Sequence, residues 1–274
     1  MNIVQKLIEA DSSSSKQILI VGDGMMDVYV HGRLESKCQE GCAKFVEERR
    51  ITAPGGAANA VRSVSHWHTE VLAFTRFGPG GPTKTRFMED GHCIFRYDDD
   101  RVDFDQSMVR EEAINALLYR PRRVDAVLLS DYDKGMLTPE FIKEVAHTCR
   151  EIGIPCVADC KRNMTIYDGC IVKGNARYWG SYPLPRDGVA TYGPDPPSVG
   201  IGVAGAVLPS VQCINHVGAG DCFAAHMTLA LAHGFSLQDA AAIAHSAGRV
   251  YVQHPHNRPP RPKEIAEDMD KASS

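Results

Sequence analysis

The residues of this sequence most suited to chemistry lie between positions 215 and 223, where a turn of small residues is followed by an acid. Gly218, Ala219 and Gly220 leave the backbone open to close approach by a ligand. The amphipathic run that follows predicts a helix, whose first free N–H groups and dipole suit an anion such as phosphate. Asp221 would stand beside that anion, where a carboxylate could take a proton from an attacking hydroxyl. An ordinary glycine-containing loop with an aspartate N-cap would give the same local pattern.

The composition restricts the kind of protein that carries this turn. With 274 residues, 43% hydrophobic and 23% charged, the chain is long enough for one large α/β domain or two small ones. A net charge of −4 without a basic block gives no indication of nucleic-acid binding. No apolar run approaches the ~20 residues that span a bilayer, so we expect no membrane partner. Nine cysteines without a paired C-x-x-C spacing favour free thiols and a reducing cytoplasm. Residues 1–17 are polar and serine-rich, without the apolar core of a signal peptide.

Polar residues follow several short apolar runs, which is the pattern of a parallel sheet with a ligand crevice at one edge. The apolar runs that we interpret as buried strands cover residues 18–21, 125–129, 154–158 and 170–172. The polar residues at or just beyond their ends are Asp23, Asp131, Asp159, Lys161, Lys173 and Asn175. Helices are predicted between them, one starting at Thr138-Pro139 and others near residues 105–118 and from Ser236. Open α/β sheets hold their ligands outside the carboxyl ends of their strands.

Two further regions predict exposed strands. Residues 28–53 alternate apolar and charged side chains, and residues 83–97 contain two strands around a turn at 89–92. Such strands could form a lid, or a sheet that meets a partner chain. Arg86 in this region could bind a substrate phosphate, although a charge on the surface of a strand would give the same pattern. Asp27 lies just beyond the first predicted strand.

The turn at Pro54-Gly55-Gly56 precedes a run of small residues that predicts a helix. Gly55 and Gly56 permit close backbone approach, and Asn59 on the first turn could hydrogen-bond a polyol. A helix start with a small packing face is the structural alternative.

Five segments of the chain, in order, resemble the PfkB/ribokinase family of sugar kinases. They are Val21 to Asp27, which places the sugar-binding acid of the family on Asp27; Gly55-Gly56-Ala57-Ala58-Asn59, like the G-G-x-x-x-N sugar loop; Ser130 to Gly135 with Ala158 to Lys161; Asn175; and Gly218-Ala219-Gly220-Asp221. The third of these is similar to segments of the heptose-phosphate kinase branch. The likeness extends from about Ile18 to Pro260.

The resemblance implies an α/β fold, a ribokinase-like doubly wound and mostly parallel sheet flanked by helices, with a small β lid at about residues 28–53 and 83–97. The domain would cover residues 18–274 and follow a polar N-terminal segment, residues 1–17. The resemblance also implies a homodimer through the lid strands.

The implied reaction is ATP-dependent phosphorylation of a hydroxyl of a sugar or sugar phosphate. Asp221 would be the base, and the amides of Gly218, Ala219 and Gly220 would stabilise charge on the transferred group. The implied substrate-binding residues are Asp27, Gly55, Gly56, Asn59, Arg86 and Asp131. The implied nucleotide-binding residues are Lys161, Asn175, Thr191 and Gly193. Magnesium would be held mainly through phosphates and water, so we expect no dedicated metal ligands.

The sequence also departs from the family pattern. The family usually has an acid three residues after the asparagine that matches Asn175, and Tyr178 stands there. Asn215 and Val217 replace a usual aspartate and threonine, and segments between Gly78 and Thr83 and between Asn175 and Thr191 are shorter than in the family. Two alternatives therefore stand beside a sugar kinase: a non-catalytic sugar- or nucleotide-binding relative, and a kinase of a nucleoside or vitamin alcohol.

Overall fold

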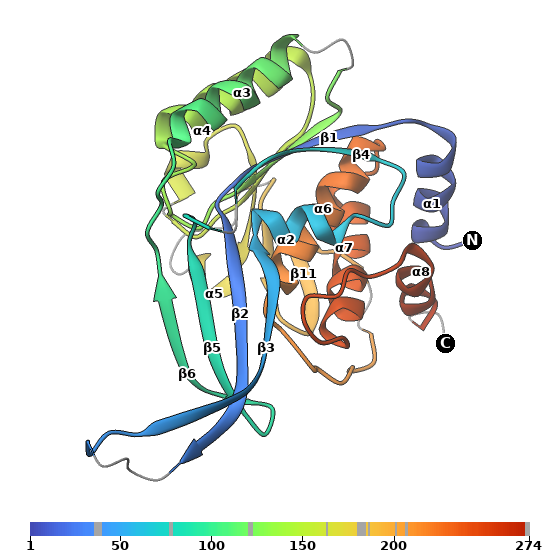
Figure 1. Cartoon of the computed structure of the whole chain (residues 1–274). Helices are drawn as coiled ribbons and strands as arrows, with labels where there is room; N and C mark the ends of the chain where they lie inside the picture. Colours follow the sequence, from blue (N-terminus) through green and yellow to red (C-terminus); the bar gives the residue numbers. More distant parts are fainter. Residues whose placement is uncertain are drawn as a thin grey trace.

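Two β-sheets of different size organise the chain (Figure 1). The computed structural model describes residues 1–35, 40–76, 79–119, 123–162, 164–179, 185, 187–200, 202–205 and 208–271. The large sheet has the strand order β12-β11-β10-β9-β8-β7-β1-β4, and the small sheet has the order β3-β2-β5-β6.

The large sheet is parallel over six of its eight strands. These strands are β1 (Gln17–Gly22), β4 (Glu70–Phe74), β7 (Ala126–Ser130), β8 (Cys156–Asp159), β9 (Ile171–Asn175) and β10 (Val189–Tyr192). Two short strands, β11 (Asp195–Val199) and β12 (Gly202–Val203), extend the sheet in antiparallel fashion. Strands β1, β7 and β8 are buried along their whole length, which explains their continuous apolar sequence.

The register of the parallel strands brings their carboxyl ends to one edge. Gly22 pairs with Ser130, Ser130 with Asp159, and Asp159 with Lys173. Polar residues that are far apart in the sequence therefore lie side by side, as the strand endings predict.

Helices cover both faces of this sheet. One face packs on α1 (Ile3–Ser13), α2 (Ala57–Ser63), α6 (Ala219–Ala232), α7 (Leu237–Val252) and α8 (Pro262–Asp270). The other face packs on α3 (Gln106–Tyr119) and α4 (Pro139–Ile152). A 3-10 turn (Met164–Tyr167) and the short α5 (Ala176–Trp179) flank β9. Side chains of β1 alternate between the two cores, Ile18 and Ile20 on one side and Leu19 and Val21 on the other. The predicted doubly wound α/β fold is confirmed.

The small sheet stands beside the main body (Figure 1). Its strands are β2 (Gly24–Glu35), β3 (Lys44–Gly56), β5 (Thr83–Glu89) and β6 (His92–Asp99). Strand β2 pairs antiparallel with β3 and parallel with β5, and β5 and β6 form a hairpin. The strands expected over 28–53 and 83–97 are present but longer, and β3 continues through Pro54-Gly55-Gly56, where the sequence suggested a stop.

Two segments differ from the sequence-based expectation. Residues 1–17, expected as a polar segment, contain α1, which starts with a capping box between Asn2 and Gln5 and buries Val4 and Leu7 in the main core. The short apolar face of α1 was not recognised in the sequence, because a run of serines follows it. The apolar run from Val203 to Leu208 predicts a strand, but only Val203 of this run belongs to β12, and positions 206–207 lie outside the described residues.

Within the described part of the chain, no helix combines the length and the apolar character needed to cross a membrane. Four of the eight described cysteines are buried, namely Cys149, Cys156, Cys160 and Cys222.

Candidate active site

The N-terminus of α6 forms the centre of the site. Its N-cap is Gly218, which has a left-handed backbone (φ +85°) and makes no side-chain cap. A Cβ at this position would lie 2.3 Å from the Asn59 Nδ2 atom and 2.5 Å from the Tyr251 hydroxyl. Conformation and packing therefore both require glycine. Asp221 lies in the first helical turn, so it is not the N-cap residue of an ordinary glycine-containing loop.

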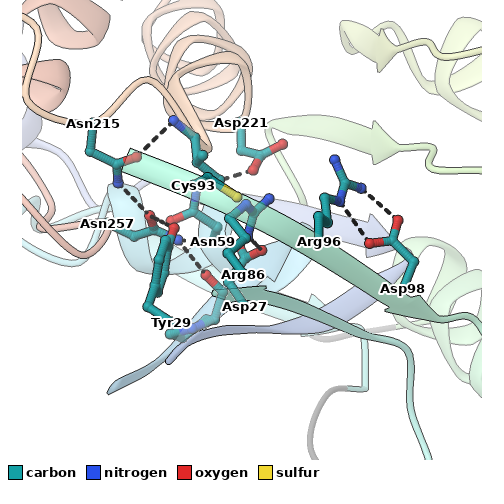
Figure 2. Close-up of polar contacts among 12 residues, drawn as sticks. Asp27, Tyr29, Asn59, Arg86, Cys93, Arg96, Asp98, Asn215, Asp221 and Asn257 are labelled. Carbon is teal, nitrogen blue, oxygen red and sulfur yellow. Dashed lines mark hydrogen bonds and ion pairs between the residues drawn. The ribbon is translucent and has the colours of Figure 1, made fainter. Parts of the chain in front are cut away.

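Asp221 is buried and hydrogen-bonded through both oxygens. Its side chain belongs to a residue that is only 2% exposed. Asn59 Nδ2 donates to Oδ2 at 3.0 Å (Figure 2), and the Tyr132 hydroxyl donates to Oδ1 at 2.5 Å. Burial raises the pKa of Asp221 to about 6, against the opposing effects of the Lys161 ammonium and these two hydrogen bonds. A carboxyl with such a pKa suits general-base chemistry near neutral pH.

Two lysines place positive charge beside this helix terminus. Lys173 Nζ lies 3.0 Å from Asp159 Oδ1 and donates to the Gly220 carbonyl oxygen at 3.0 Å. Lys161 Nζ lies 3.3 Å from both oxygens of Asp159. Burial alone would raise the pKa of Asp159, but the two ammonium groups outweigh it, and the net shift is downward. The Asp159 carboxylate therefore stays ionised and holds both lysines.

The predicted site residues of the small sheet also come together. Asp27 is buried, and its Oδ1 accepts a hydrogen bond from Arg86 Nη1 at 2.7 Å (Figure 2). A Cβ on Gly55 would lie 2.5 Å from Asp27 Oδ2, so the glycine makes room for the carboxylate. Gly56 has φ +58°, and a Cβ there would lie 2.3 Å from the Asp23 carbonyl oxygen. Arg86 also lies over the ring of Tyr29, 5.5 Å from its centroid. Arg86 is thus a buried partner of Asp27 and not a charge on the strand surface.

Asn257 connects this pair to the loop before α6, and no sequence pattern singled it out. Its Nδ2 donates to Pro54 O at 3.1 Å and to Asp27 Oδ2 at 3.4 Å, and its Oδ1 accepts from Asn215 Nδ2 at 3.1 Å. Asn215 Oδ1 in turn accepts from the Val217 backbone N–H at 3.0 Å. Figure 2 shows the chain of contacts. Asn257 has a positive φ of 55°, a conformation rare outside glycine and asparagine and often found at functional sites.

The loop after β7 is fixed by Asp23. The Asp23 carboxylate accepts hydrogen bonds from the backbone N–H groups of Tyr132 at 2.8 Å, Lys134 at 3.1 Å and Met136 at 3.0 Å. These bonds set the path of the loop and deliver the Tyr132 side chain to Asp221. Tyr132 belongs to a segment that resembles the family, but the sequence indicated no role for it, because its contact with Asp221 spans 89 positions.

Two of the predicted substrate ligands, Asn59 and Asp131, make several hydrogen bonds within the protein. Asn59 Nδ2 donates to Asp221 and to the Gly218 carbonyl oxygen at 3.1 Å, and Oδ1 accepts from Tyr251 at 3.3 Å, so its amide orients the Asp221 carboxylate. Asp131 is fully buried, and it accepts from the Asp133 backbone N–H, from Arg162 and from the Tyr167 hydroxyl. These contacts make Asp131 an anchor of its loop, because its oxygens are already engaged with the protein.

The residues expected on the nucleotide side lie further along the same sheet edge. Asn175 and Thr191 are register partners on β9 and β10, and Gly193 follows in a turn with φ +70°. The side chain of Tyr178 lies outside the described residues. Among the described residues, no group of three or more His, Cys, Asp or Glu is arranged to hold a metal ion. The donors at the α6 terminus, namely backbone amides and two ammonium groups, fit the phosphates of a nucleotide.

Comparison with solved structures defines the class of fold. The chain superposes on a carbohydrate kinase from Agrobacterium tumefaciens with a TM-score of 0.64 at 17% identity, covering 94% of this chain and 98% of that one. It superposes on phosphofructokinase-2 from Escherichia coli in complex with potassium with a TM-score of 0.67 at 14% identity, covering 95% of this chain and 99% of that one. For Arabidopsis thaliana ribokinase complexed with ribose and ATP, the TM-score is 0.65 at 13% identity, covering 93% of this chain and 98% of that one. The fold is ribokinase-like.

Sequence comparison finds similarity to one family of kinases and to curated relatives. Residues 186–264 match the family described as pfkB family carbohydrate kinase. Relatives named bifunctional protein HldE include those of Hyphomonas neptunium, 29% identical over 61% of this chain, and of Caulobacter sp. strain K31, 28% identical over 87%. The aligned parts span 40% and 60% of those two relatives. The pfkB match over residues 186–264, the relatives named HldE and the ribokinase-like fold confirm the resemblance inferred from the motifs.

Proposed function

We propose that this protein is a carbohydrate kinase that transfers a phosphoryl group from ATP to a hydroxyl of a sugar or sugar phosphate. The observation that carries the proposal is the buried Asp221 beside the N-terminus of α6, with its pKa raised to about 6. The pfkB family match and the ribokinase-like fold support the same reaction class.

In the proposed mechanism, the residues of the chain supply charge balance and proton transfer. Asp221 takes the proton of the attacking hydroxyl as that hydroxyl bonds to the transferred phosphorus. The Gly218–Gly220 amides and the Lys161 ammonium stabilise negative charge on the moving group. Lys173 positions the Gly220 peptide through its carbonyl oxygen. Magnesium bound with ATP would neutralise phosphate charge.

The substrate end of the site favours a polyol that carries a phosphate. Asp27, held by Arg86 and Asn257, offers carboxylate oxygens for sugar hydroxyls. Lys84 on β5 makes no ion pair within the described ranges, and burial lowers its pKa. An anionic group of a ligand would therefore stabilise its ammonium. A heptose phosphate is our first candidate. The chain is similar to relatives named HldE, and two of its segments resemble the heptose-phosphate kinase branch.

An ADP-release assay with ATP and magnesium tests the proposal. The acceptors are ribose, fructose, fructose 6-phosphate, a heptose phosphate, adenosine and pyridoxal. We expect turnover of at least one sugar or sugar phosphate, and a loss of at least about 100-fold in kcat for Asp221→Asn. Asp90→Asn in the exposed β5–β6 turn is the matched control, because asparagine tolerates its positive φ of 47°. Equal rates in the wild type and Asp221→Asn would remove Asp221 from the mechanism.

A non-catalytic binding relative is the second candidate. The acid expected three residues after Asn175 is Tyr178, which favours this alternative. Calorimetry that detects sugar binding without ATP binding, together with no turnover of any acceptor, would support it. Preferred turnover of adenosine or pyridoxal would instead support a kinase of a non-sugar alcohol.

A further inference from the structure

The Tyr132 hydroxyl occupies a position on Asp221 that an acceptor hydroxyl would need. It donates to Asp221 Oδ1 at 2.5 Å, while Asn59 fills Oδ2 at 3.0 Å. Asp221 is 2% exposed, so solvent and ligands do not reach its carboxylate directly. Tyr132 is only half-buried and is the more exposed member of this pair. An alcohol that is to lose its proton to Asp221 must therefore replace this phenol.

The surroundings of the Tyr132 ring suit an anionic ligand. Lys84 Nζ lies 5.0 Å from the ring centroid, and Lys161 Nζ lies 4.8 Å from it. The two lysines come from different sheets, Lys84 from β5 of the small sheet and Lys161 from the segment after β8 of the large one. The aromatic face stabilises both ammonium groups in the absence of an anion. When the ring leaves, both would face the vacated volume, where a phosphorylated acceptor can use them.

The contacts of the loop indicate how Tyr132 would leave. The backbone N–H of Tyr132 is bound to Asp23, as are those of Lys134 and Met136. Asp131 adds an anchor through the Asp133 N–H and Arg162. A backbone fixed at so many points leaves rotation of the Tyr132 side chain as the available movement.

We propose that Tyr132 is a placeholder, a side chain that occupies the acceptor position on Asp221 in the unliganded protein. A phosphorylated acceptor displaces the Tyr132 side chain. The acceptor then takes over the hydrogen bond to the Asp221 carboxylate and the contacts with Lys84 and Lys161. This inference rests on the proposed function, because it assigns the displaced position to the acceptor of the kinase. No covalent step is involved. Tyr132 is here a positioning residue that sets acceptor affinity.

Tyr132→Phe tests the proposal, because it removes the hydroxyl and keeps the ring over both lysines. An acceptor would no longer compete with a charge-assisted hydrogen bond. We expect the KM for the best acceptor of the panel to fall by about fivefold or more, with kcat changed less than about twofold. The Kd of the same acceptor, measured by calorimetry without ATP, should fall in parallel. Tyr119→Phe is the matched control, since Tyr119 on α3 is 77% exposed.

The pH profile provides a readout that a purely structural role would not move. In the free protein, burial raises the pKa of Asp221, and the hydrogen bond from Tyr132 opposes this rise. Lys161 and Asn59 also lower the pKa of Asp221, and Asp159 raises it. Tyr132→Phe should therefore move the acidic limb of kcat/KM to higher pH. The acidic limb of kcat should stay in place, because it reports the complex in which Tyr132 has already left.

The outcomes separate this proposal from the proposed function. A Tyr132→Phe protein with lower kcat and unchanged KM would overturn the placeholder, because the hydroxyl would then act in the transition state. Unchanged kinetics and an unchanged pH profile would overturn it as well, while leaving the kinase assignment intact. Turnover by the variant of an acceptor that the wild type leaves untouched would be the strongest support. No turnover by either protein would contradict the proposed function itself, and the placeholder with it.

Discussion

At the scale of single residues, the buried carboxyl that we propose for catalysis should also destabilise the folded protein. Asp221 is buried with an ionisable carboxyl whose pKa is raised to about 6, above its ordinary value of 3.8. Below that ordinary value the group is protonated in the folded and unfolded states alike, and its burial carries no electrostatic penalty. As the pH rises through about 6 the folded protein must hold a buried charge, so this contribution to stability is lost.

Asp221→Asn should therefore stabilise the protein at high pH while it removes activity. An amide cannot ionise, and its two ends can still pair with Asn59 and Tyr132, because a phenol both donates and accepts. The shift from 3.8 to about 6 corresponds to a gain of about 3 kcal/mol at pH 8, or about 6–12 °C in Tm, and almost none at pH 3.5. Thermal melts of both proteins at the two pH values measure this. A gain of equal size at both pH values would contradict the assignment of the raised pKa to Asp221.

Gly218→Ala tests the steric requirement of the turn. The substitution adds a left-handed alanine and a Cβ only 2.3 Å from Asn59 Nδ2, the group that orients Asp221. Gly234→Ala is the matched control, because Gly234 has φ +80° and an added Cβ there would meet nothing within 4 Å. We expect the control to lose about 1 kcal/mol, and Gly218→Ala to lose more stability and at least about tenfold in kcat. Chemical denaturation and initial rates give both values. Equal effects of the two substitutions would show that backbone conformation alone matters at Gly218.

The sequence predicted the local backbone geometry around the candidate site well where the signal is local. The small-residue turn before Asp221 indicated a helix N-terminus, and Gly55 beside Asp27 indicated close backbone approach, and both have the expected geometry. Contacts between distant positions left no such signal. Tyr132 reaches Asp221 across 89 positions, and Asn257 reaches Asp27 across 230. Asp131 looked like a ligand because it follows a strand, but its partners Arg162 and Tyr167 could not be inferred from spacing.

At the scale of elements, the apolar runs of β1, β7, β8 and β9 were sufficient to predict a parallel sheet with polar residues at one edge. The crossover through α4 keeps β7 and β8 parallel. Strand β11 contains two prolines, Pro196 and Pro197, and the sequence there carries no strand pattern. The helix α1 was missed because its apolar face comprises few residues and is followed by a run of serines.

Asn257 is the residue that links the small sheet to the loop before α6. Asn257→Gly removes the side chain and keeps the backbone compatible with a positive φ. Loss of its bonds to Asp27, Pro54 and Asn215 should raise the KM for the acceptor by about tenfold and lower kcat as well. His256→Gly, at the neighbouring position with the same φ, is the control, and steady-state kinetics compare the two. A similar loss in both variants would attribute the effect to loop flexibility and not to the amide.

At the scale of the whole molecule, the small sheet presents an exposed apolar face. Strand β6 exposes Ile94, Phe95 and Tyr97, and Phe95 is 60% exposed while it packs on Phe87. The first and last helices of the chain, α1 and α8, pack against each other away from this face (Figure 1). The predicted homodimer through the lid strands would cover the β6 face and leave both ends free.

Light scattering tests the homodimer. We expect the mass of two chains for the wild type and of one chain for Phe95→Glu, because a buried carboxylate on the shared face is unfavourable. Tyr119→Glu on α3 serves as the control for adding a charge at an exposed aromatic position. A wild-type monomer at micromolar concentration would contradict the prediction.

The central claim is that Asp221 removes the proton of the acceptor hydroxyl during phosphoryl transfer. The most direct measurement is the single-turnover rate of transfer from ATP to the best acceptor at pH 8, in the wild type and in Asp221→Asn, with acceptor binding measured in parallel by calorimetry. The account predicts that the rate falls by at least about 100-fold while acceptor affinity changes by less than about tenfold. A transfer rate that is unchanged in Asp221→Asn, with acceptor bound, would contradict it.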